Sequence, residues 1–383
     1  YEMSASLVGS EMCIRDRIRV AQVVGKMVGG GVEAVVMNYY RHIDRSKVQF
    51  DFLVDSDSTL VPREEIESLG GRVFEIPPYQ HVVEYQKELQ RLFRQENWSI
   101  VHSHINALSI FPLRAAKVSG IPVRIAHSHS TSGKGEYSKN AVKWILRHFA
   151  NNYPTARVAC SERAGRWLFG EKHDFTLFYN AIDLERYKFN AGKRRRTRDD
   201  LGIENDTFVI GHMGRFMAQK NHSFLITAFA KFLKLEPNSL LLLAGNGDHI
   251  GQIEDLAAKL GVADKVRFLG YRSDSDCLYQ AFDCFALPSL YEGLPLVAVE
   301  AQRSGLHCLL STAITREVAL TEGVEFLDID SIDEWVKAFL TCSKDRARND
   351  APISLFTAYN TEDAALRLQN YYCDLISGAQ HAK

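Results

Sequence analysis

Short runs of apolar and β-branched residues alternate with longer amphipathic stretches along the chain from Ile18 onward. Such a short apolar run predicts a buried strand, whereas apolar residues that recur every three or four positions predict a helix. The predicted strands begin at Ile18, Gln49, Arg72, Ser99, Val123 and Ala156 in the first half, and at Phe208, Ser239, Lys265, Asp283 and His307 in the second. Buried strands separated by helices are typical of parallel sheets covered on both faces. We therefore predict an α/β protein.

The alternation occurs twice, which predicts two doubly wound domains. A chain of 383 residues also exceeds the length at which a single core usually stops growing. We place the first Rossmann-like domain at 18–185 and the second at 190–355, with a hinge in the polar stretch that joins them. Residues 1–17 contain acidic residues and no long apolar core, so they do not resemble a signal peptide and are expected to be extraneous to the fold.

Composition and charge narrow the range of functions. Hydrophobic residues make up 46% of the chain and charged residues 24%, a balance typical of a soluble globular protein. The formal net charge of -1 supplies no field to attract nucleic acid, which is therefore not expected as a partner. The cysteines form no Cys-x-x-Cys pair, which argues against a zinc site or a disulfide framework and fits a reducing cytoplasm. The basic run Lys193–Arg198 is expected to be a solvated helix start.

The segment Leu287–Gly305 contains the most informative pair of acidic residues, Glu292 and Glu300. A strand is predicted to end at Pro288, and Pro295 suits the first turn of the helix that follows. Eight residues separate the two carboxylates, which is about 12 Å if the whole span is helical. This spacing suits a ligand as long as a nucleotide sugar, because glycosidase carboxylates stand roughly 5 to 9.5 Å apart. The alternative is that both are ordinary helix charges.

A second segment, Ile210–Phe224, places two cations after a predicted strand. The strand runs into Gly214 and Arg215, and Lys220 precedes a helix that the side chain of Asn221 is expected to cap. Cations beside a helix N-terminus form an anion site, which could stabilise a departing diphosphate in the way that a metal ion does elsewhere. The alternative is a surface turn without function.

Two glycine-rich turns follow other predicted strands. Gly245 and Gly247 come after the strand in Leu242–His249, where the absence of a side chain lets the backbone approach a ligand. The turn at Gly29–Gly31 separates the first strand from a helix. It lacks the G-x-G-x-x-G spacing and a ribose-binding acid, so a dinucleotide site is not predicted there.

With these segments in place, the chain resembles a retaining glycosyltransferase of family 4. The resemblance extends from Ile18 to about Ile376, and the sequence EGLPLVAVE at 292–300 is its most diagnostic part. Within the family the chain is most similar to bacterial exopolysaccharide and capsule glycosyltransferases. The resemblance implies the GT-B fold, in which two Rossmann-like doubly wound parallel-sheet domains face each other across a cleft. It also implies a final helix, at about residues 361–380, that crosses back to the first domain.

The same resemblance implies roles for residues of this chain. Glu292 would contact the transferred sugar, Glu300 the ribose, and Arg215 and Lys220 the diphosphate, with no metal ion and no cofactor besides the nucleotide sugar as co-substrate. The other donor-binding positions would be Gly214, Asn246, Gly247, Leu269, Tyr271, Gly293, Leu294, Pro295 and Leu296, together with Gly29, Gly30 and Gly31 in the first domain. The departing phosphate oxygen would take the proton of the acceptor, so no protein nucleophile is nominated.

The active-site histidine that the resemblance implies falls in the sequence AHSHS. His129 is the first choice and His127 the second, because either could hydrogen-bond a sugar hydroxyl or the leaving phosphate. His102 and His104 are expected to be structural or exposed.

Three alternatives stand beside a metal-independent transferase. The motif Asp274-Ser-Asp276 matches the D-x-D metal site of another glycosyltransferase fold, but its place at a predicted helix start favours capping. A noncatalytic sugar-binding or scaffold subunit would keep the same fold, as would a nucleotide-sugar epimerase.

The expected partners are a nucleotide-sugar donor, with UDP-sugar favoured over GDP-sugar, and a glycan or lipid-linked acceptor. No apolar run approaches the roughly 20 residues of a membrane-spanning helix. A helix predicted at 139–150 places basic residues at four-residue intervals beside Trp144, Ile145 and Phe149, and it could rest on a membrane. The alternative is an amphipathic helix packed on its own sheet. We expect a cytoplasmic protein, either free or peripheral on the inner face of the membrane.

Overall fold

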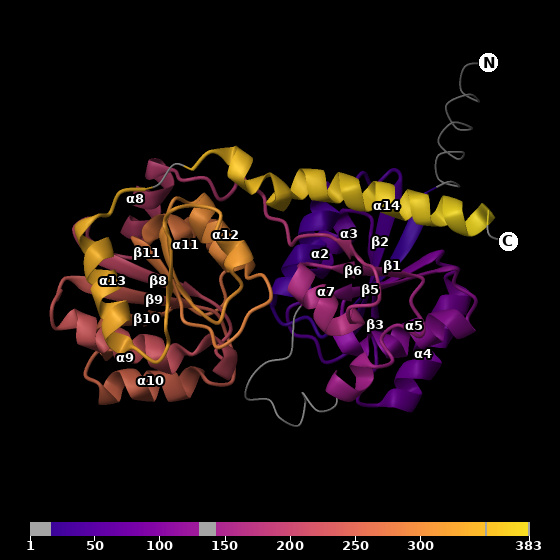
Figure 1. The fold of residues 1–383 in the computed structure, drawn as a ribbon, viewed down its shortest axis with the longest axis horizontal. Helices are drawn as coiled ribbons and strands as arrows, with labels where there is room; N and C mark the ends of the chain where they lie inside the picture. The colour runs from indigo at the N-terminus through magenta and orange to yellow at the C-terminus, as the bar shows by residue number, and fades with distance from the viewer. Residues whose placement is uncertain (1–16, 130–142, 349–350, 382–383) are drawn as a thin grey trace, which may run out of the picture. The chain divides into compact units, whose positions relative to one another are not determined.

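A computed structural model describes residues 17–129, 143–348 and 351–381 (Figure 1). Within this part of the chain, the residues up to Ala181 and those from Thr361 onward form one compact unit, and Ile182–Asn360 form another. Apart from Arg17, the segment 1–17 lies outside the described residues. None of the described helices is both long enough and apolar enough to cross a membrane.

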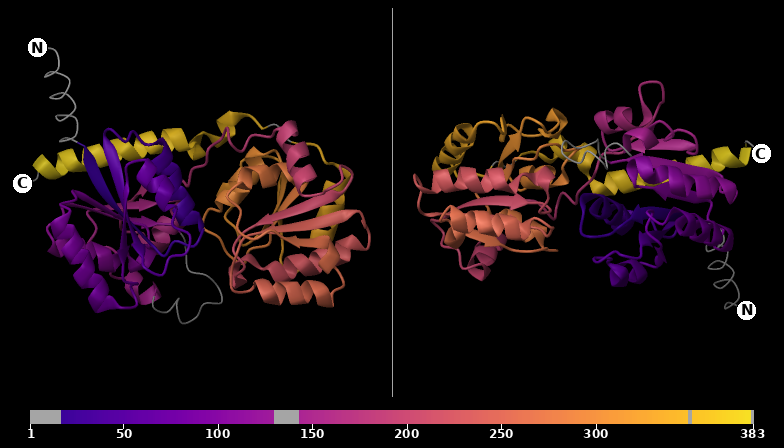
Figure 2. Two further views of the ribbon diagram at one scale, coloured as in Figure 1. Left: turned by 180° about the vertical axis from the view of Figure 1, so that it is seen from behind. Right: turned by 90° about the horizontal axis from the view of Figure 1, so that it is seen from below.

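The first unit is built on seven parallel strands in the order β3-β2-β1-β4-β5-β6-β7. The strands are β1 (Ile18–Gly25), β2 (Val48–Asp55), β3 (Arg72–Ile76), β4 (Ile100–Ser103), β5 (Val123–Ser128), β6 (Ala156–Ala159) and β7 (Thr176–Leu177). The helices are α2 (Gly31–His42), α3 (Arg63–Ser68), α4 (Val82–Gln95), α5 (Ile110–Val118), α7 (Glu162–Phe169) and α14 (Thr361–His381). They lie on both faces of the sheet (Figure 2).

The second unit repeats the arrangement with six parallel strands in the order β10-β9-β8-β11-β12-β13. The strands are β8 (Phe208–Met213), β9 (Ser239–Ala244), β10 (Val266–Phe268), β11 (Cys284–Leu287), β12 (His307–Ser311) and β13 (Val324–Leu327). The helices are α8 (Ala191–Asp200), α9 (His222–Leu233), α10 (Ile250–Lys259), α11 (Ser275–Ala281), α12 (Leu296–Arg303) and α13 (Ile332–Lys344). The prediction of two doubly wound parallel sheets is confirmed.

Every predicted strand is present, and the two strands that the pattern missed lie at sheet edges. β7 has only two residues, which is too short to show a pattern. β13 carries an exposed Glu325 between partly buried neighbours, so it has no continuous apolar run. By contrast, α9 has a clear apolar stripe, which is buried in the core of the second unit with Leu225, Phe229 and Phe232 fully covered.

The basic run Lys193–Arg198 lies in α8, and the prediction of a solvated helix start is wrong for two of its residues. Arg194 donates to the carboxylate of Asp283 and to carbonyl oxygens at the end of α11. Arg198 is buried and pairs with the same carboxylate. Burial lowers the pKa of the Arg198 guanidinium, and Asp283 opposes that effect. Because Asp283 also accepts the N–H of Val209 in β8, this carboxylate ties α8 to the sheet.

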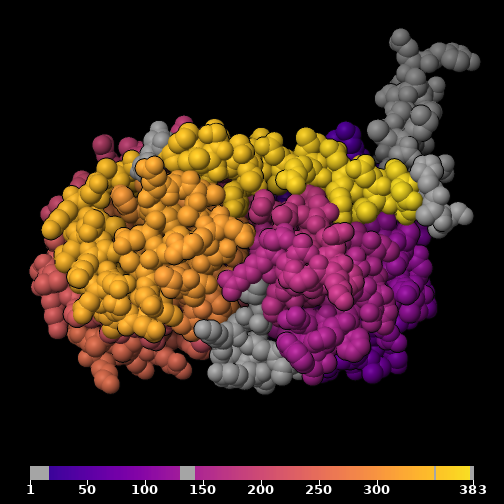
Figure 3. Space-filling view, viewed as in Figure 1, coloured from indigo at the N-terminus to yellow at the C-terminus, as the bar shows by residue number. Residues whose placement is uncertain are grey.

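The C-terminal helix α14 completes the first unit. Ala365, Leu368 and Tyr372 on one of its sides are buried, and the helix packs against α2. Figure 1 shows α14 running along the unit, and Figure 3 shows that its other side stays at the surface. A helix of this kind owes its stability to the packing of its apolar stripe.

Truncation of that stripe should destabilise the first unit. We expect Leu368→Ala to lower the free energy of unfolding by about 2–4 kcal/mol, because it leaves a cavity beneath α14. Leu366→Ala removes the same atoms from a side chain that is 56% exposed and should cost less than about 0.5 kcal/mol. Urea unfolding of both variants measures the difference, and equal losses would show that the stripe does not hold α14 in place.

Candidate active site

In the second unit, the residues that the sequence singled out gather at one edge of the sheet. They follow the carboxyl ends of four adjacent strands, β10, β9, β8 and β11. Leu269 and Tyr271 follow β10, Gly245 to Gly247 follow β9, Gly214 to Lys220 follow β8, and Glu292 to Pro295 follow β11. In open parallel sheets, ligands bind at this edge.

Glu292 is held by three hydrogen-bond donors. Nζ of Lys220 donates to Oε1 at 2.7 Å, and the hydroxyl of Ser289 donates to the same oxygen at 2.8 Å. The amide of Gln219 donates to Oε2 at 3.1 Å, and the Leu290 N–H donates to the Gln219 carbonyl. A carboxylate offers about four acceptor positions. Within the described residues, one acceptor position of Glu292, on Oε2, is therefore left for a ligand.

The two predicted cations are held differently. Lys220 is paired with Glu292, whereas the exposed side chain of Arg215 has no hydrogen bond or ion pair to another described residue. The sequence interpretation did not include His212, which is buried at the end of β8 and donates from Nδ1 to the carbonyl of Ala286 at 2.8 Å. Burial lowers the pKa of His212 to about 4, so its Nε2 is a bare acceptor at neutral pH.

Glycine lets the turns after β8 and β9 touch. A Cβ on Gly245 would lie 2.1 Å from the carbonyl oxygen of Gly214, and a Cβ on Gly247 would lie 2.3 Å from that of Phe216. The Phe216 N–H also donates to the carbonyl of Asn246 at 2.9 Å. The close backbone approach predicted for these glycines is therefore made to another turn of the same chain.

Asn221 stands at the N-cap of α9, but the prediction that its side chain caps the helix is wrong. The residue has φ 54° and ψ 43°, and its side chain makes no capping hydrogen bond. Asparagine is one of the few residues other than glycine that tolerate this left-handed conformation. Its contribution is the turn of the backbone from the short helix Ala218–Lys220 into α9.

Glu300 lies in α12, four residues after the helix begins, and accepts a hydrogen bond from the hydroxyl of Tyr279 at 2.8 Å. Burial raises the pKa of Glu300, while hydrogen bonds from Tyr279 and Tyr187 lower it. The sequence interpretation missed both tyrosines, because an aromatic residue at a helical spacing is indistinguishable from an ordinary core residue. They orient the carboxylate that the resemblance places on the ribose.

The remaining donor-binding positions flank these groups. Leu294 and Leu296 are buried, and Tyr271 is 49% exposed. Pro295 is the N-cap of α12, one residue before the first turn in which it was predicted.

In the first unit, a carboxylate of the chain itself binds the backbone N–H groups of the glycine turn after β1. The carboxylate of Glu33 accepts the N–H groups of Val28, Gly29 and Gly30 at 3.0, 2.6 and 2.7 Å. Backbone N–H groups at the start of a helix form an anion site. Here a carboxylate of the chain fills it, so the turn does not present these N–H groups to a phosphate in this structure.

His127 and His129 belong to a buried cluster of polar side chains, which we call the histidine network. Its members are Gln22 in β1, His102 and His104 at the end of β4, His127 and His129 at the end of β5, and Tyr372 in α14. His102 lies 3.1 Å from His127 and His104 lies 2.9 Å from His129, measured between ring nitrogens. His102 and His104 are thus buried, so the expectation that they are exposed is wrong.

The D-x-D motif does not cap α11 in the way that was predicted. Asp274 is at the N-cap position without a capping hydrogen bond and accepts two from Arg272, at 2.7 and 2.6 Å. Asp276 pairs with Arg186 and Lys193. Both carboxylates are therefore already neutralised by cations of the chain.

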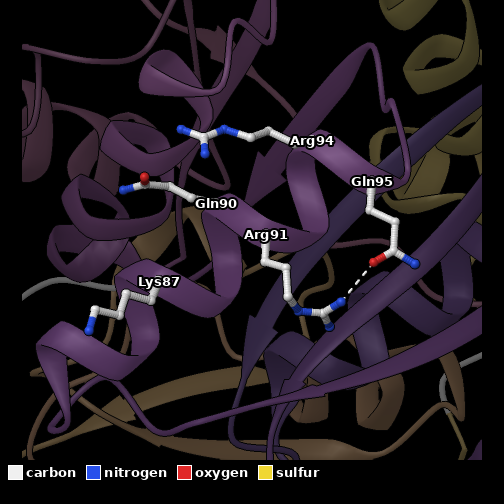
Figure 4. Close-up of a pocket in the computed structure, with 5 residues that line it drawn as sticks. All are labelled: Lys87, Gln90, Arg91, Arg94 and Gln95. Atoms are coloured by element: carbon white, nitrogen blue, oxygen red, sulfur yellow. Dashed lines mark hydrogen bonds between the residues drawn. The ribbon is translucent and has the colours of Figure 1, made fainter.

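A shallow hollow on α4 lies apart from these strand ends. It is lined by Lys87, Gln90, Arg91, Arg94 and Gln95, all from one helix (Figure 4). Arg91 donates to Gln95 and to Glu88 on the same helix. Such an arrangement is typical of a solvated helix face.

The fold and the strand-end site define the class of two-unit GT-B proteins, and solved structures of that class match. The Anabaena Alr3699/HepE structure in complex with UDP-glucose is 19% identical, covers 92% of this chain and 99% of its own, and superposes with a TM-score of 0.76. The sucrose-phosphate synthase of Thermosynechococcus elongatus is 18% identical, with a TM-score of 0.77 over 94% of this chain and 100% of its own.

The sequence comparisons identify the family. The model for Glycosyltransferase Family 4 matches residues 29–186, and the model for Glycosyl transferases group 1 matches 193–353. The Bacillus subtilis (strain 168) protein EpsF is 39% identical over 309 residues, which are 78% of this chain and 80% of EpsF. An Escherichia coli UDP-Gal:alpha-D-GlcNAc-diphosphoundecaprenol alpha-1,3-galactosyltransferase is 23% identical over 384 residues, 94% of this chain and 98% of its own. The chain therefore belongs to the family 4 glycosyltransferases and is an enzyme of that kind.

The raised pKa of Glu300 predicts that its carboxylate lowers the stability of the fold at neutral pH, although it is needed for binding. Above the unfolded-state pKa of about 4.5 the unfolded chain loses this proton more readily than the folded one, so folding is penalised as pH rises. We expect Glu300→Gln to raise the melting temperature at pH 7 by about 2–4 °C, or about 1 kcal/mol, and to have no such effect near pH 4.

Thermal unfolding at the two pH values measures this effect. The same variant should lose the stabilisation that a nucleotide gives the wild type. A variant that is less stable than wild type at pH 7 would contradict the assignment.

Proposed function

We propose that the chain is a retaining, metal-independent transferase that moves a hexose or related sugar from a nucleotide diphosphate sugar to a glycan or lipid-linked acceptor in cell-surface or exopolysaccharide synthesis. The observation that carries the proposal is the constellation of Lys220, Glu292 and Arg215 at the carboxyl ends of adjacent strands, with Glu300 in α12, the next helix after Glu292. It supplies cations for a diphosphate and carboxylates for hydroxyl groups at one edge of one sheet.

The charges of this constellation suit the departure of a nucleoside diphosphate. Negative charge grows on the phosphate oxygen as the bond to the sugar breaks, and fixed cations stabilise it without reorganisation. Arg215 has a guanidinium free of other described partners, and Lys220 is held in place by Glu292. Glu292 keeps one acceptor position, which a hydroxyl of the sugar can fill. Glu300, oriented by Tyr279, accepts from the ribose in the same way.

The nature of donor and acceptor is supported by the relatives. The Anabaena structure holds UDP-glucose, and the Escherichia coli enzyme is named for a UDP-galactose donor and a diphosphoundecaprenol-linked acceptor. We infer a UDP-sugar donor for this chain, used without a metal ion or other cofactor. A noncatalytic subunit or an epimerase of the same fold is the alternative.

Removal of the Lys220 cation tests the proposal. We expect Lys220→Met to lower kcat/KM for release of UDP from UDP-glucose or UDP-galactose by about 10²–10³-fold, because the leaving diphosphate loses a fixed charge. Lys231→Met removes an exposed lysine of α9, the helix that follows Lys220. Lys231 pairs with Asp333 at the surface, and its loss should leave the rate unchanged.

The same assay with and without EDTA tests the metal independence. Turnover that EDTA abolishes would overturn that part of the proposal. If no UDP- or GDP-sugar is turned over or stabilises the protein, the noncatalytic alternative is favoured.

A lipid-linked acceptor would require the enzyme to bind at a membrane surface. The first unit has exposed apolar side chains that could make this contact. The side chains of Trp144, Ile145 and Phe149 are 58%, 56% and 47% exposed. Of the helix predicted at 139–150, residues 143–147 are helical, and 139–142 lie outside the described residues. Because these apolar side chains are about half exposed, we propose that they rest on the inner face of the membrane.

Vesicle binding measures this contact. We expect the double variant Trp144→Ser, Ile145→Ser to bind phosphatidylglycerol-containing vesicles about tenfold more weakly in a sedimentation assay, because less apolar surface is removed from water. The matched control is Leu235→Ser, which changes a side chain of similar exposure, 59%, in the second unit. Equal binding by wild type and the double variant would argue against the membrane contact.

A further inference from the structure

The histidine network has two ends. Both ring nitrogens of His102 and both of His104 have hydrogen-bond partners inside the network. By contrast, Nε2 of His127 and Nδ1 of His129 have no hydrogen-bond partner among the described residues, although both are buried. Buried polar atoms without partners are rare in native proteins and point to a ligand or a catalytic role.

One branch of the network runs through the C-terminal helix. The amide nitrogen of Gln22 donates to the hydroxyl oxygen of Tyr372 at 3.1 Å, so the hydroxyl proton is directed to Nδ1 of His102 at 2.7 Å. His102 then carries its proton on Nε2 and donates it to Nδ1 of His127 at 3.1 Å. A neutral His127 must therefore have its own proton on Nε2. This branch ends in a donor.

The other branch starts at the same glutamine. The amide oxygen of Gln22 accepts from Nε2 of His104 at 2.8 Å, which leaves Nδ1 of His104 as an acceptor. That nitrogen accepts from Nε2 of His129 at 2.9 Å, so Nδ1 of a neutral His129 has no proton. This branch ends in an acceptor. All four rings then carry their proton on Nε2.

The opposite polarity of the two ends does not depend on which way the amide of Gln22 points. If the amide turns over, every hydrogen bond reverses, all four rings carry their proton on Nδ1, His127 ends in an acceptor and His129 in a donor. A single residue therefore couples both branches, since a carboxamide offers one acceptor side and one donor side.

The scheme requires neutral rings, because an imidazolium donates from both nitrogens and would break a branch. Burial lowers the pKa values of all four histidines, to about 3 for His102 and His129. The side chain of Asn180 favours the charged form of His129, but the effect of burial is larger. The rings are neutral at physiological pH.

We propose that Gln22 and Tyr372 are positioning residues that hold His127 and His129 as a paired donor and acceptor for the hydroxyl groups of a sugar. The two rings are stacked with their centroids 3.8 Å apart, so the donor and the acceptor would serve hydroxyl groups that are close together. A sugar hydroxyl both donates and accepts, and it matches such a pair. The inference rests on the proposed function for its substrate class, because the sugar that His127 and His129 would contact is the one that the proposed reaction transfers.

A metal ion is the competing occupant. The ligand nitrogens of His102, His104 and His127 lie within 4.8 Å of one another, which is close enough for a shared ion. Coordination would use lone pairs that now accept hydrogen bonds from Tyr372 and from the partner rings. The network and a metal centre therefore exclude each other, which makes the choice measurable.

Nitrogen-15 NMR of the full chain labelled at histidine reads the tautomers directly. In the wild type, we expect His102, His104, His127 and His129 to be neutral and to share one tautomer. Gln22→Glu replaces the amide with two acceptors when ionised. In the branch through Tyr372, His102 and His127 should then carry their protons on Nδ1. In the other branch, His104 and His129 should carry theirs on Nε2. Mixed tautomers in the wild type, charged rings, or no difference in an ionised Gln22→Glu variant would overturn the network.

Added Zn²⁺ separates the two occupants. We expect one equivalent of Zn²⁺ to leave the histidine resonances and the melting temperature unchanged. The proposal fails, and the site is a metal site, if Zn²⁺ shifts those resonances and stabilises the protein while Gln22→Glu does not change the tautomers of one branch only.

Kinetics test the link to the sugar. We expect Tyr372→Phe to lower kcat/KM for UDP-glucose or UDP-galactose about tenfold, the effect of one lost hydrogen bond in the site. Tyr371→Phe is the matched control, because its hydroxyl interacts with Thr176 and not with the network. Unchanged kinetics in Tyr372→Phe would overturn the sugar role. A wild type without turnover would instead refute the proposed function and with it the sugar role, while the NMR result decides the network.

Discussion

In the second unit, the site depends on a close contact between two stretches of backbone, where the turn after β9 packs on the turn after β8. Gly245 and Gly247 leave no room for a side chain against the carbonyl oxygens of Gly214 and Phe216. The packed turn continues into the short helix that carries Lys220, and the ammonium of Lys220 binds Glu292 from the loop after β11. The position of Lys220, and through it the contact with Glu292, thus depends on contacts that only glycine permits. A methyl group there would disturb the site although it touches no ligand.

The sequence predicted the strands well because buried parallel strands are continuous apolar runs. It singled out Glu292 and Glu300 by the eight residues that separate them. It could not show what holds them. The donors Gln219 and Tyr279 approach through tertiary packing, which no local pattern records. Asn221 shows a related limit: a side-chain cap and a left-handed backbone favour the same residue type, so the sequence left the two indistinguishable.

The histidine network illustrates the same limit over longer separations. His102 and His127 are 25 residues apart in the chain, and His102 and Tyr372 are 270 apart. Parallel pairing places Gln22 opposite His102 in the sheet, and the residues two positions further along each strand face the same side. The sequence could name His127 and His129 as candidates. Their pairing with His102 and His104 follows from strand register, which a single sequence does not reveal.

The two units solve the problem of buried polar groups in different ways. The second unit places the charged pair of Lys220 and Glu292 at its strand ends, which suits a ligand that is itself an anion. The first unit keeps its histidines neutral and satisfies them in a chain of hydrogen bonds, which avoids the large cost of a buried charge. A neutral ring keeps one donor and one acceptor, and it can therefore distinguish the two sides of a hydroxyl group. An imidazolium presents donors only and would attract phosphate without that discrimination. In the proposed function, the neutral rings of the first unit would recognise hydroxyl groups, and the paired charges of the second would recognise a diphosphate.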